Sequence, residues 1–266
     1  MTARILHVSD LHIGRRDTQE PYAALQELAA RVQPNLLLAT GDLAHRGRRS
    51  ELLHAREVLE SLRVPFLAVP GNHDIPYTVP ARFSRPFAEW ERVFGPVDPV
   101  YDSDELVVVG LSSVRPWRQQ GGAVEEAALR QAIARVREAP ARALRVVAFH
   151  HHLAAPPWRA ARKRPLSRRG QVLRRLAAAG AELVVGGHVH QASVTELREF
   201  LAVEDGRPGP LVLATAPGLG RPRPRRQGEA QGLNVYESDA QTLAVVTFVW
   251  NETSFVEVAR RSFPRG

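Results

Sequence analysis

Short apolar runs alternate with amphipathic segments along the first two thirds of the chain. The apolar runs have the length and composition of strands that are buried on both faces, and they cover residues 5–9, 36–40, 66–69, 107–111, 144–149 and 183–185. The segments between them carry apolar positions at helical spacing, at residues 21–32, 50–62, 125–136 and 167–179. Ser50 is a candidate N-cap and Gly180 a candidate C-cap. Strand followed by helix, repeated, predicts an α/β fold.

The pattern changes after His190. Apolar stretches follow one another with no convincing helix between them, at residues 194–200, 211–215, 233–236, 243–250 and 254–258. We expect these to be antiparallel strands that form a second sheet. A chain of 266 residues fits one large domain better than two. We therefore expect a single domain over residues 1–266, with the α/β part in residues 1–190 and mainly second-sheet strands in residues 191–266.

The composition limits the chemistry that the chain can carry. Cysteine is absent, which excludes disulfides and thiolate zinc sites, so any metal ion must be bound by nitrogen and oxygen atoms. The net charge of +8 would ordinarily suggest a polyanionic partner such as nucleic acid. However, Lys163 is the only lysine, and arginine in place of lysine throughout indicates a coding bias more than a selected binding face.

Basic side chains nevertheless gather in two stretches. A solvated surface is the first interpretation, and an electrostatic funnel for a phosphate-bearing substrate is the alternative, because one stretch closely follows His150. The basic residues are Arg159, Arg162, Lys163, Arg164, Arg168, Arg169, Arg174 and Arg175 in the first stretch, and Arg221, Arg223, Arg225 and Arg226 in the second.

The chain shows no signal for export or for membrane insertion. Residues 1–4 lead directly into an apolar strand without a basic and then apolar leader, and no apolar run is long enough to cross a bilayer. We therefore expect a cytoplasmic protein with no membrane partner.

Five of the apolar runs are followed immediately by residues whose side chains can bind metal ions. In open α/β folds functional groups gather at the carboxyl ends of strands, so residues far apart in sequence should converge there. The candidates are Asp10 and His12, Asp42, Asn72 with His73 and Asp74, His150 with His151 and His152, and His188 with His190.

The local spacing supports this convergence. Asp10 and His12 are two residues apart, as are His188 and His190, and in an extended chain that spacing points both side chains the same way. Glycines next to the candidate ligands permit backbone conformations and close approaches that a side chain would block. These glycines are Gly41, Gly71, Gly186 and Gly187.

The set of candidate ligands predicts a dinuclear metal centre. Two carboxylates, an asparagine and four imidazoles are too many for one catalytic zinc ion, but they suit two ions that share a carboxylate. Two ions roughly 3.5 to 4 Å apart would bind the oxygens of a phosphate ester and lower the pKa of a bridging water. Phosphoester hydrolysis is the natural reaction. His73 could then donate a proton to the leaving oxygen or stabilise the transition state.

The ordered motifs D-x-H, G-D, G-N-H-D, a histidine after an apolar strand, and G-H-x-H resemble those of the calcineurin-like metallophosphoesterase family, from residue 7 to residue 190. The resemblance implies a four-layer sandwich of two mixed sheets with helices outside and a dinuclear site at the carboxyl ends of the strands. It also implies a role for each candidate. One metal ion would be bound by Asp10, His12, Asp42 and His190. The other would be bound by Asp42, Asn72, His150 and His188, so that Asp42 would bridge the two ions. His73 would be the catalytic residue that is not a ligand, and Asp74 would orient His73.

The resemblance also suggests a substrate. The histidine triplet His150 to His152 and the G-N-H-D motif are most similar to the branch that cleaves cyclic nucleotides and other small phosphodiesters. In that branch proline often follows the histidines closely, whereas here Leu153-Ala154-Ala155 intervene before Pro156-Pro157. We expect a small phosphodiester as the substrate and two divalent ions, Mn, Fe, Zn or Co, as cofactors. The sequence does not predict an oligomeric state.

Two other functional classes are compatible with the motifs. A DNA-processing nuclease would suit the basic charge, but such enzymes usually carry a further DNA-binding or capping domain, for which we expect this chain to be too short. A non-catalytic interaction module on the same fold would be expected to have lost ligands, and none is missing here. Both rank below a small-molecule phosphodiesterase.

Several nearby residues have two interpretations. His7 lies inside the first strand and is expected to be a core residue more than a ligand. His151 either contacts substrate or fixes its loop, and His45 and Arg46 either approach a phosphate or simply occupy a loop. Of the histidine triplet, one or two rings are expected to be solvent-exposed or to pack against the loop. Four tryptophans, Trp90, Trp117, Trp158 and Trp250, are expected to pack in the core, with Trp117 and Trp158 favoured as walls of the site.

Overall fold

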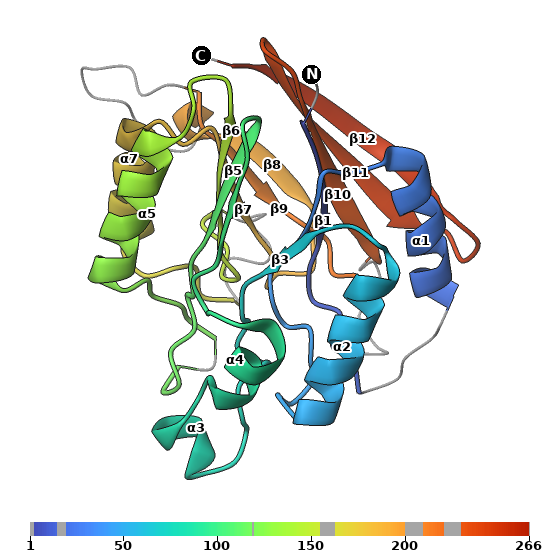
Figure 1. Cartoon of the computed structure of the whole chain (residues 1–266), viewed down its shortest axis with the longest axis vertical. Coiled ribbons are helices and arrows are strands. Elements are labelled where there is room, and N and C mark those ends of the chain that lie inside the picture. Colours follow the sequence, from blue (N-terminus) through green and yellow to red (C-terminus); the bar gives the residue numbers. More distant parts are fainter. Residues whose placement is uncertain are drawn as a thin grey trace.

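Two six-stranded sheets lie face to face, with helices on both outer faces (Figure 1). The computed structural model describes residues 3–14, 20–118, 120–154, 163–199, 210–220 and 230–265. This arrangement is the predicted α/β sandwich of four layers, and both sheets are mixed.

The first sheet has the strand order β12-β11-β10-β1-β2-β3. Strands β1, β2 and β3 are parallel, whereas β10, β11 and β12 add to the other side of β1 in antiparallel pairs. The bounds are β1 Ala3–Val8, β2 Leu36–Ala39, β3 Phe66–Ala68, β10 Gly232–Ser238, β11 Thr242–Trp250 and β12 Phe255–Pro264.

The second sheet has the strand order β4-β5-β6-β7-β9-β8. Its four central strands are parallel, and β4 and β8 close the two edges in antiparallel pairs. The bounds are β4 Val100–Asp102, β5 Leu106–Gly110, β6 Leu144–Ala148, β7 Leu183–Gly186, β8 Ser193–Glu196 and β9 Val212–Thr215.

The strands after His190 do not form a sheet of their own, so that part of the prediction was wrong. Strands β8 and β9 complete the sheet that begins with β4, and β10 to β12 complete the sheet that contains β1. Strand β9 is also parallel to β7, not antiparallel. The alternation of apolar residues marks a strand and its faces, but it contains no information on which sheet edge the strand will join.

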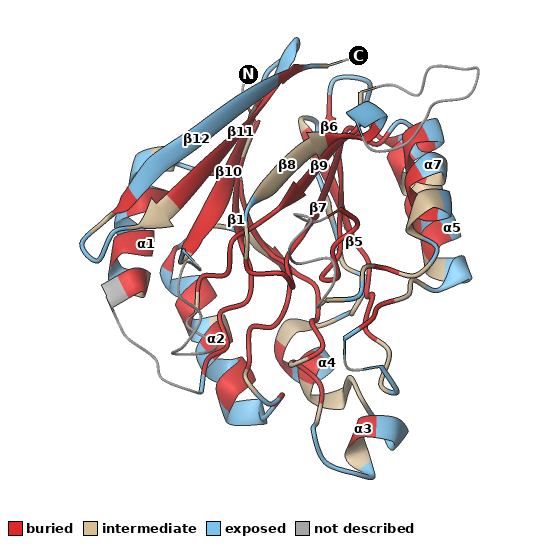
Figure 2. Cartoon of the chain, turned by 180° about the vertical axis from the view of Figure 1, so that it is seen from behind, coloured by how far each residue is buried: buried red, intermediate tan, exposed pale blue. Residues whose placement is uncertain are grey.

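Three apolar layers hold the sandwich together. On β2 the side chains alternate: Leu37 and Ala39 face the helices, whereas Leu36 and Leu38 pack between the sheets. The middle layer is filled from both sheets, for example by Val108 on β5. Both faces of the central strands are therefore buried, which explains why the sequence shows them as continuous apolar runs (Figure 2).

Helices cover the two outer faces (Figure 1). Helices α1, α2 and α4 pack on the sheet of β1, and α5 and α7 pack on the sheet of β6. The helices are α1 Glu20–Val32, α2 Arg49–Ser61, α3 Ala81–Ser84, α4 Ala88–Phe94, α5 Glu126–Glu138 and α7 Arg169–Ala179, and a 3-10 turn spans Leu197–Glu199. None of the helices within these described ranges is long and apolar enough to cross a membrane.

The sequence analysis missed α3, α4 and β4. All three are short, and Trp90 and Val93 are the only buried positions of α4, too few to show a helical period. Trp90 is fully buried and stacks on Phe94 with 4.5 Å between ring centroids, so its predicted packing role is confirmed.

A polar network crosses the middle layer beside β1. The His7 ring is fully buried, and its Nδ1 and Nε2 atoms lie 2.7 Å from the Tyr236 hydroxyl and 2.8 Å from Thr40 Oγ1. Asn234 continues the network, because its amide nitrogen lies 3.4 Å from the same hydroxyl and Thr247 donates to its oxygen. His7 is thus a core residue, as predicted.

Replacing Tyr236 with phenylalanine should destabilise the fold. The Tyr236→Phe variant keeps the ring but leaves a buried nitrogen of His7 without a partner, so we expect the free energy of unfolding to fall by about 1–3 kcal/mol. Urea denaturation measures this change. The matched control is Tyr101→Phe, because the Tyr101 hydroxyl makes no hydrogen bond to the described part of the chain; equal effects of the two variants would contradict the network.

Candidate metal centre

The carboxyl ends of the parallel strands of both sheets meet at one end of the molecule. Strands β1, β2 and β3 of the first sheet and β6 and β7 of the second each end next to a candidate ligand. The donor atoms form two buried groups, and within each group they lie within 4.8 Å of one another. The groups are Asp10, His12 and His190, and Asp42, His150 and His188.

The first group combines a carboxylate with two imidazoles. Nε2 of His190 lies 3.0 Å from Asp10 Oδ1 and 3.3 Å from Nε2 of His12. The other oxygen of Asp10 accepts hydrogen bonds from the Ser9 hydroxyl at 2.7 Å and from the His188 backbone N–H at 2.9 Å. These bonds fix the carboxylate so that Oδ1 faces the imidazoles.

The second group includes an amide oxygen. Nε2 of His150 lies 3.4 Å from Asp42 Oδ2, 3.2 Å from Asn72 Oδ1 and 3.2 Å from Nδ1 of His188. The opposite ring nitrogen of His150 donates to the carbonyl of Thr40 at 2.7 Å. That bond fixes the orientation of the ring and directs Nε2 into the group.

Asp42 links the two groups. Its Oδ2 atom lies 3.9 Å from Nε2 of His12 and 3.4 Å from Nε2 of His150, so one oxygen faces both groups. This atom is buried and accepts no hydrogen bond of ordinary geometry from the described residues. The other oxygen, Oδ1, accepts from the His73 backbone N–H at 2.8 Å.

Five of the candidate ligands adopt a left-handed backbone conformation. Their φ angles are positive, which is uncommon outside glycine and which clusters at functional sites. The residues are Asp10, His12, Asp42, His188 and His190. The paired side chains therefore converge through turns, and the expected extended backbone at these positions was wrong.

Close backbone approaches at the site require glycine. A Cβ atom on Gly71 would lie 2.2 Å from the Asp42 nitrogen, and one on Gly187 would lie 1.8 Å from Ser9 Oγ. Gly41 has a φ of +82° and packs against Gly71 just as closely. Gly186 is different, because an added Cβ would make only ordinary contacts at 3.5 Å and beyond.

The electrostatics of the site follow from burying carboxylates among imidazoles. Burial alone would raise the pKa of Asp42, but the imidazoles around it, His150 first, hold that pKa well below its usual range. Burial alone would lower the pKa of His150, but Asp42 raises it to about 9. The site therefore stabilises a positive charge between its carboxylates, which a proton or a metal ion can supply.

The donor set fits divalent metal ions. All the converging atoms are nitrogen or oxygen. Pairs of them lie 3.2 to 3.3 Å apart, and there are not enough protons on these atoms for every such pair to be a hydrogen bond. A cation between such atoms turns a repulsive contact into a ligand pair. The residues present could therefore hold two divalent ions, such as Mn, Fe, Zn or Co.

His73 is held beside the first group by partners that the sequence did not reveal. Its ring centroid lies 4.8 Å from that of His12, and its Nδ1 lies 2.9 Å from the carbonyl of His45 and 2.7 Å from the Tyr77 hydroxyl. Asp74, expected to orient this ring, instead accepts hydrogen bonds from the backbone N–H groups of Ala44 and Gly71, both at 2.7 Å.

Asp74 therefore ties together the loops that follow β2 and β3. Burial, and then the charge of Asp42, raise the pKa of Asp74 to about 8, although its two backbone donors favour the charged form. The expectation that Asp74 orients His73 directly was wrong, because sequence adjacency does not fix which way neighbouring side chains of a turn point.

All three histidines of the triplet are buried, which rules out exposed rings and leaves the alternative that one or two of them pack against the loop. His151 exchanges two contacts with Ser113: its Nδ1 lies 2.8 Å from the hydroxyl, and its backbone N–H donates to that hydroxyl at 3.1 Å. This pairing supports the loop-fixing interpretation of His151. His152 stacks on His188 with ring centroids 5.7 Å apart.

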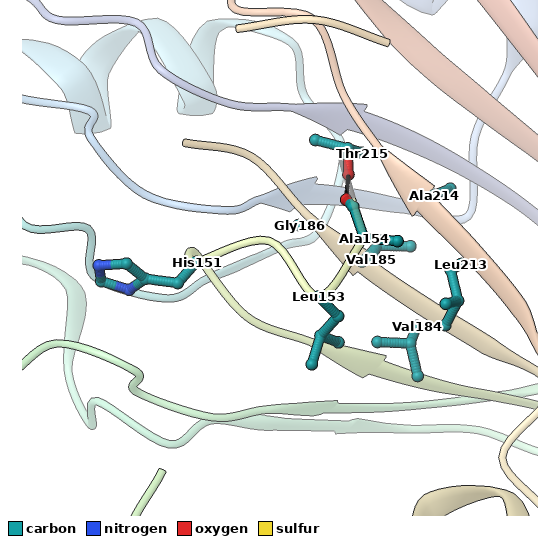
Figure 3. A pocket seen from close by; sticks show the side chains of 9 residues that line it. All are labelled: His151, Leu153, Ala154, Val184, Val185, Gly186, Leu213, Ala214 and Thr215. Carbon is teal, nitrogen blue, oxygen red and sulfur yellow. Dashed lines mark hydrogen bonds between the residues drawn. The ribbon is translucent and has the colours of Figure 1, made fainter. Parts of the chain in front are cut away.

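A small pocket lies beside the triplet, where Leu153 and Ala154 pass over the paired strands β7 and β9 (Figure 3). Most of its lining residues are aliphatic, and the hydroxyl of Thr215 donates to the carbonyl of Ala154 at 3.5 Å. The ring of His151 points away from the other lining side chains (Figure 3). The converging polar groups thus lie at the strand ends and not in this pocket.

Other sequence-based interpretations differ from the structure or concern residues outside the described ranges. Trp117 is 69% exposed, so it does not pack in the core, while Trp158 lies outside the described residues. The same holds for Arg159 and Arg162 of the first basic stretch and for the whole basic series from Arg221 to Arg226. Ser9, Thr40 and Tyr77 contact the candidate ligands or His73 but were not predicted. Only Ser9 gave a signal, as the neighbour of Asp10.

The amino-acid sequence matches a known family. A family model described as "Calcineurin-like phosphoesterase" matches residues 3–192, which is most of the chain. The chain belongs to this family. The match includes every candidate ligand, so the family resemblance seen in the motifs is confirmed.

Relatives within the calcineurin-like phosphoesterase family carry several names. A "Probable cyclic nucleotide phosphodiesterase" from Moraxella catarrhalis is 31% identical over 102 residues, covering 37% of this chain and 35% of that protein. A "Probable glycerophosphodiester phosphodiesterase" from Arcobacter nitrofigilis is 26% identical over 132 residues, covering 46% of this chain and 48% of that protein. A "DNA double-strand break repair protein Mre11" from Sulfurisphaera tokodaii is 26% identical over 128 residues, covering 42% of this chain and 33% of that protein.

A solved structure shows the same fold. The purple acid phosphatase PPD1 of yellow lupin superposes with a TM-score of 0.74 at 11% identity, covering all of this chain and 54% of that one. The matched segments thus span between a third and about half of the relatives' own lengths.

Metal binding should release a proton and strengthen with pH. Because the pKa of His150 is raised to about 9, its imidazole carries a proton at neutral pH that an incoming ion must displace. We expect the Mn²⁺ affinity to rise by up to about tenfold per pH unit between pH 6 and 8. Isothermal titration calorimetry in buffers of different ionisation enthalpy measures both the affinity and the protons released. An affinity that does not change with pH would contradict this account.

Proposed function

We propose that the protein is a metal-dependent phosphodiesterase. The observation that carries the proposal is the position of Asp42 Oδ2, which faces His12 at 3.9 Å and His150 at 3.4 Å. One carboxylate oxygen between two groups of nitrogen and oxygen donors is the arrangement that suits two ions sharing a ligand.

The proposed ligand sets follow the two groups. Asp10, His12, Asp42 and His190 hold one ion, and Asp42, Asn72, His150 and His188 hold the other. When bound, two such ions supply Lewis-acid activation of the phosphoryl group and of the attacking water. The protein keeps these ligands fixed through backbone contacts, including the bonds from Ser9 and the His188 N–H to Asp10.

His73 is proposed to protonate the leaving oxygen. Its ring lies next to His12 and is half-buried, so part of it is open to solvent beside the first group. The carbonyl of His45 accepts the proton of Nδ1 at 2.9 Å, which leaves Nε2 as the atom that exchanges a proton with the substrate.

A small phosphodiester is the proposed substrate class. Two of the relatives are named for cyclic nucleotides and for glycerophosphodiesters, and both are diesters of phosphate. The resemblance to a DNA repair protein makes a nuclease the second candidate. A panel of cyclic nucleotides, glycerophosphodiesters and single- and double-stranded DNA separates the two, since a nuclease would prefer DNA with a strong dependence on salt.

Activity toward a generic diester should depend on Asp42. With bis-p-nitrophenyl phosphate and Mn²⁺, we expect the Asp42→Ala variant to lose more than about 100-fold in kcat/KM, because both ions lose a ligand. Asp104→Ala is the matched control, since that carboxylate is exposed and pairs with Arg142. Release of p-nitrophenol measures the rate. If wild type and Asp42→Ala are equally inactive, the proposed function is wrong.

The loss caused by removing His73 should depend on the leaving group. For a diester with an alkyl leaving group, we expect His73→Ala to lose about 10²- to 10⁴-fold in kcat, because the alkoxide needs a proton. The loss should be much smaller for p-nitrophenolate, which leaves without one. Steady-state kinetics on the two substrates check this, and equal losses would assign His73 to binding instead of protonation.

A further inference from the structure

A buried arginine joins two loops at the carboxyl end of the strands. Arg82 on α3 is 7% exposed, and its guanidinium donates to the carbonyl of Pro116 at 2.8 Å and to that of Pro76 at 3.0 Å. One loop follows β3 of the first sheet and the other follows β5 of the second (Figure 1). Arg82 thus sets the spacing between loops that come from different sheets.

Arg82 binds the carbonyls of two prolines, and each proline is followed in the sequence by an exposed aromatic residue. Tyr77 follows Pro76 and is 45% exposed, and Trp117 follows Pro116 and is 69% exposed. Exposed tryptophan is uncommon, because its large apolar ring is usually well buried, as Trp90 is in this chain. Arg82 therefore fixes the backbone directly before two exposed aromatic residues.

Tyr77 is continuous with the proposed catalytic site. The Tyr77 hydroxyl lies 2.7 Å from Nδ1 of His73, with the two ring centroids 5.5 Å apart, and the His73 ring in turn contacts His12. A substrate that contacts His73 therefore comes within reach of Tyr77. The position argues for a substrate contact and against a surface that only a distant partner would use.

A positive charge lies beside the Tyr77 ring. The guanidinium carbon of Arg82 lies 5.7 Å from the centre of the Tyr77 ring, and Arg115 and Arg118 flank Trp117 in the sequence. Aromatic faces next to positive charge are the features with which proteins bind nucleobases that carry phosphate. A glycerol or simple alkyl group would gain little from such rings.

We propose that Tyr77 and Trp117 form a stacking subsite for the planar base of a nucleoside phosphodiester, with Arg82 as the residue that positions both. The inference rests on the proposed function, because it assumes that the phosphate of the same molecule lies at the metal centre. It adds a preference for nucleoside diesters over glycerophosphodiesters.

Binding of a nucleotide and of its base-free counterpart tests the subsite without turnover. Isothermal titration calorimetry of the Mn²⁺-loaded protein would compare adenosine monophosphate with ribose 5-phosphate, which lacks the base. For Trp117→Leu we expect the affinity for adenosine monophosphate to fall by about tenfold and the affinity for ribose 5-phosphate to stay within about twofold. Trp117→Phe should retain most of the nucleotide affinity, because a ring is still present.

Two further variants assign the roles. Tyr77→Phe keeps the ring and removes the hydroxyl, so it should bind adenosine monophosphate like the wild type. Val258→Ala, an exposed apolar position on β12 in the other half of the chain, is the control for nonspecific effects. Thermal melts of all variants establish that they fold.

Three results would overturn the subsite. They are an unchanged nucleotide affinity in Trp117→Leu, an equal loss of affinity for ribose 5-phosphate, and a change in oligomeric mass on light scattering, which would assign the aromatic pair to self-association. If the wild type binds the nucleotide more tightly than ribose 5-phosphate but hydrolyses no diester, the subsite stands and the proposed function fails. If it hydrolyses diesters but binds the nucleotide no more tightly than ribose 5-phosphate, the proposed function stands and the subsite fails.

Discussion

The structure depends on the burial of two carboxylates, Asp10 and Asp42, where the two sheets meet. Both are fully buried, and within the described residues their ion-pair contacts are with histidines only. Removing a carboxylate from water costs several kcal/mol unless positive charge and hydrogen bonds compensate. The imidazoles supply the charge when protonated and supply ligands when a divalent ion takes the place of the proton. Folding and metal binding therefore act on the same set of atoms.

The surrounding fold is arranged to hold this cluster. Parallel strands of both sheets end at the same edge, and the turns after them place five candidate ligands in a left-handed backbone conformation. Gly71 and Gly187 allow those turns to approach more closely than any side chain would permit. Asp74 and His151 tie neighbouring loops together through backbone and hydroxyl groups. Strain of this kind persists only where the packing around it is rigid, and the three apolar layers provide that rigidity.

The sequence predicted those features that local chemistry determines. Buried strands were visible as apolar runs, and the candidate ligands were visible because each follows such a run. The sheet that β8 and β9 join was not predictable, because alternation fixes the faces of a strand but not its neighbours. The partners of Asp74 and His73 were not predictable either, since they depend on how loops 30 residues apart pack. Tyr77 was missed for the same reason: its role appears only when its hydroxyl is seen beside His73.

The account as a whole rests on Asp42 as a ligand shared by two ions. Anomalous scattering from a crystal of the protein grown with Mn²⁺ measures this most directly. The account predicts two peaks roughly 3.5 to 4 Å apart, one beside His12 and His190 and one beside His150 and His188, with Asp42 Oδ2 between them. A single peak, or two peaks of which only one contacts Asp42, would contradict it.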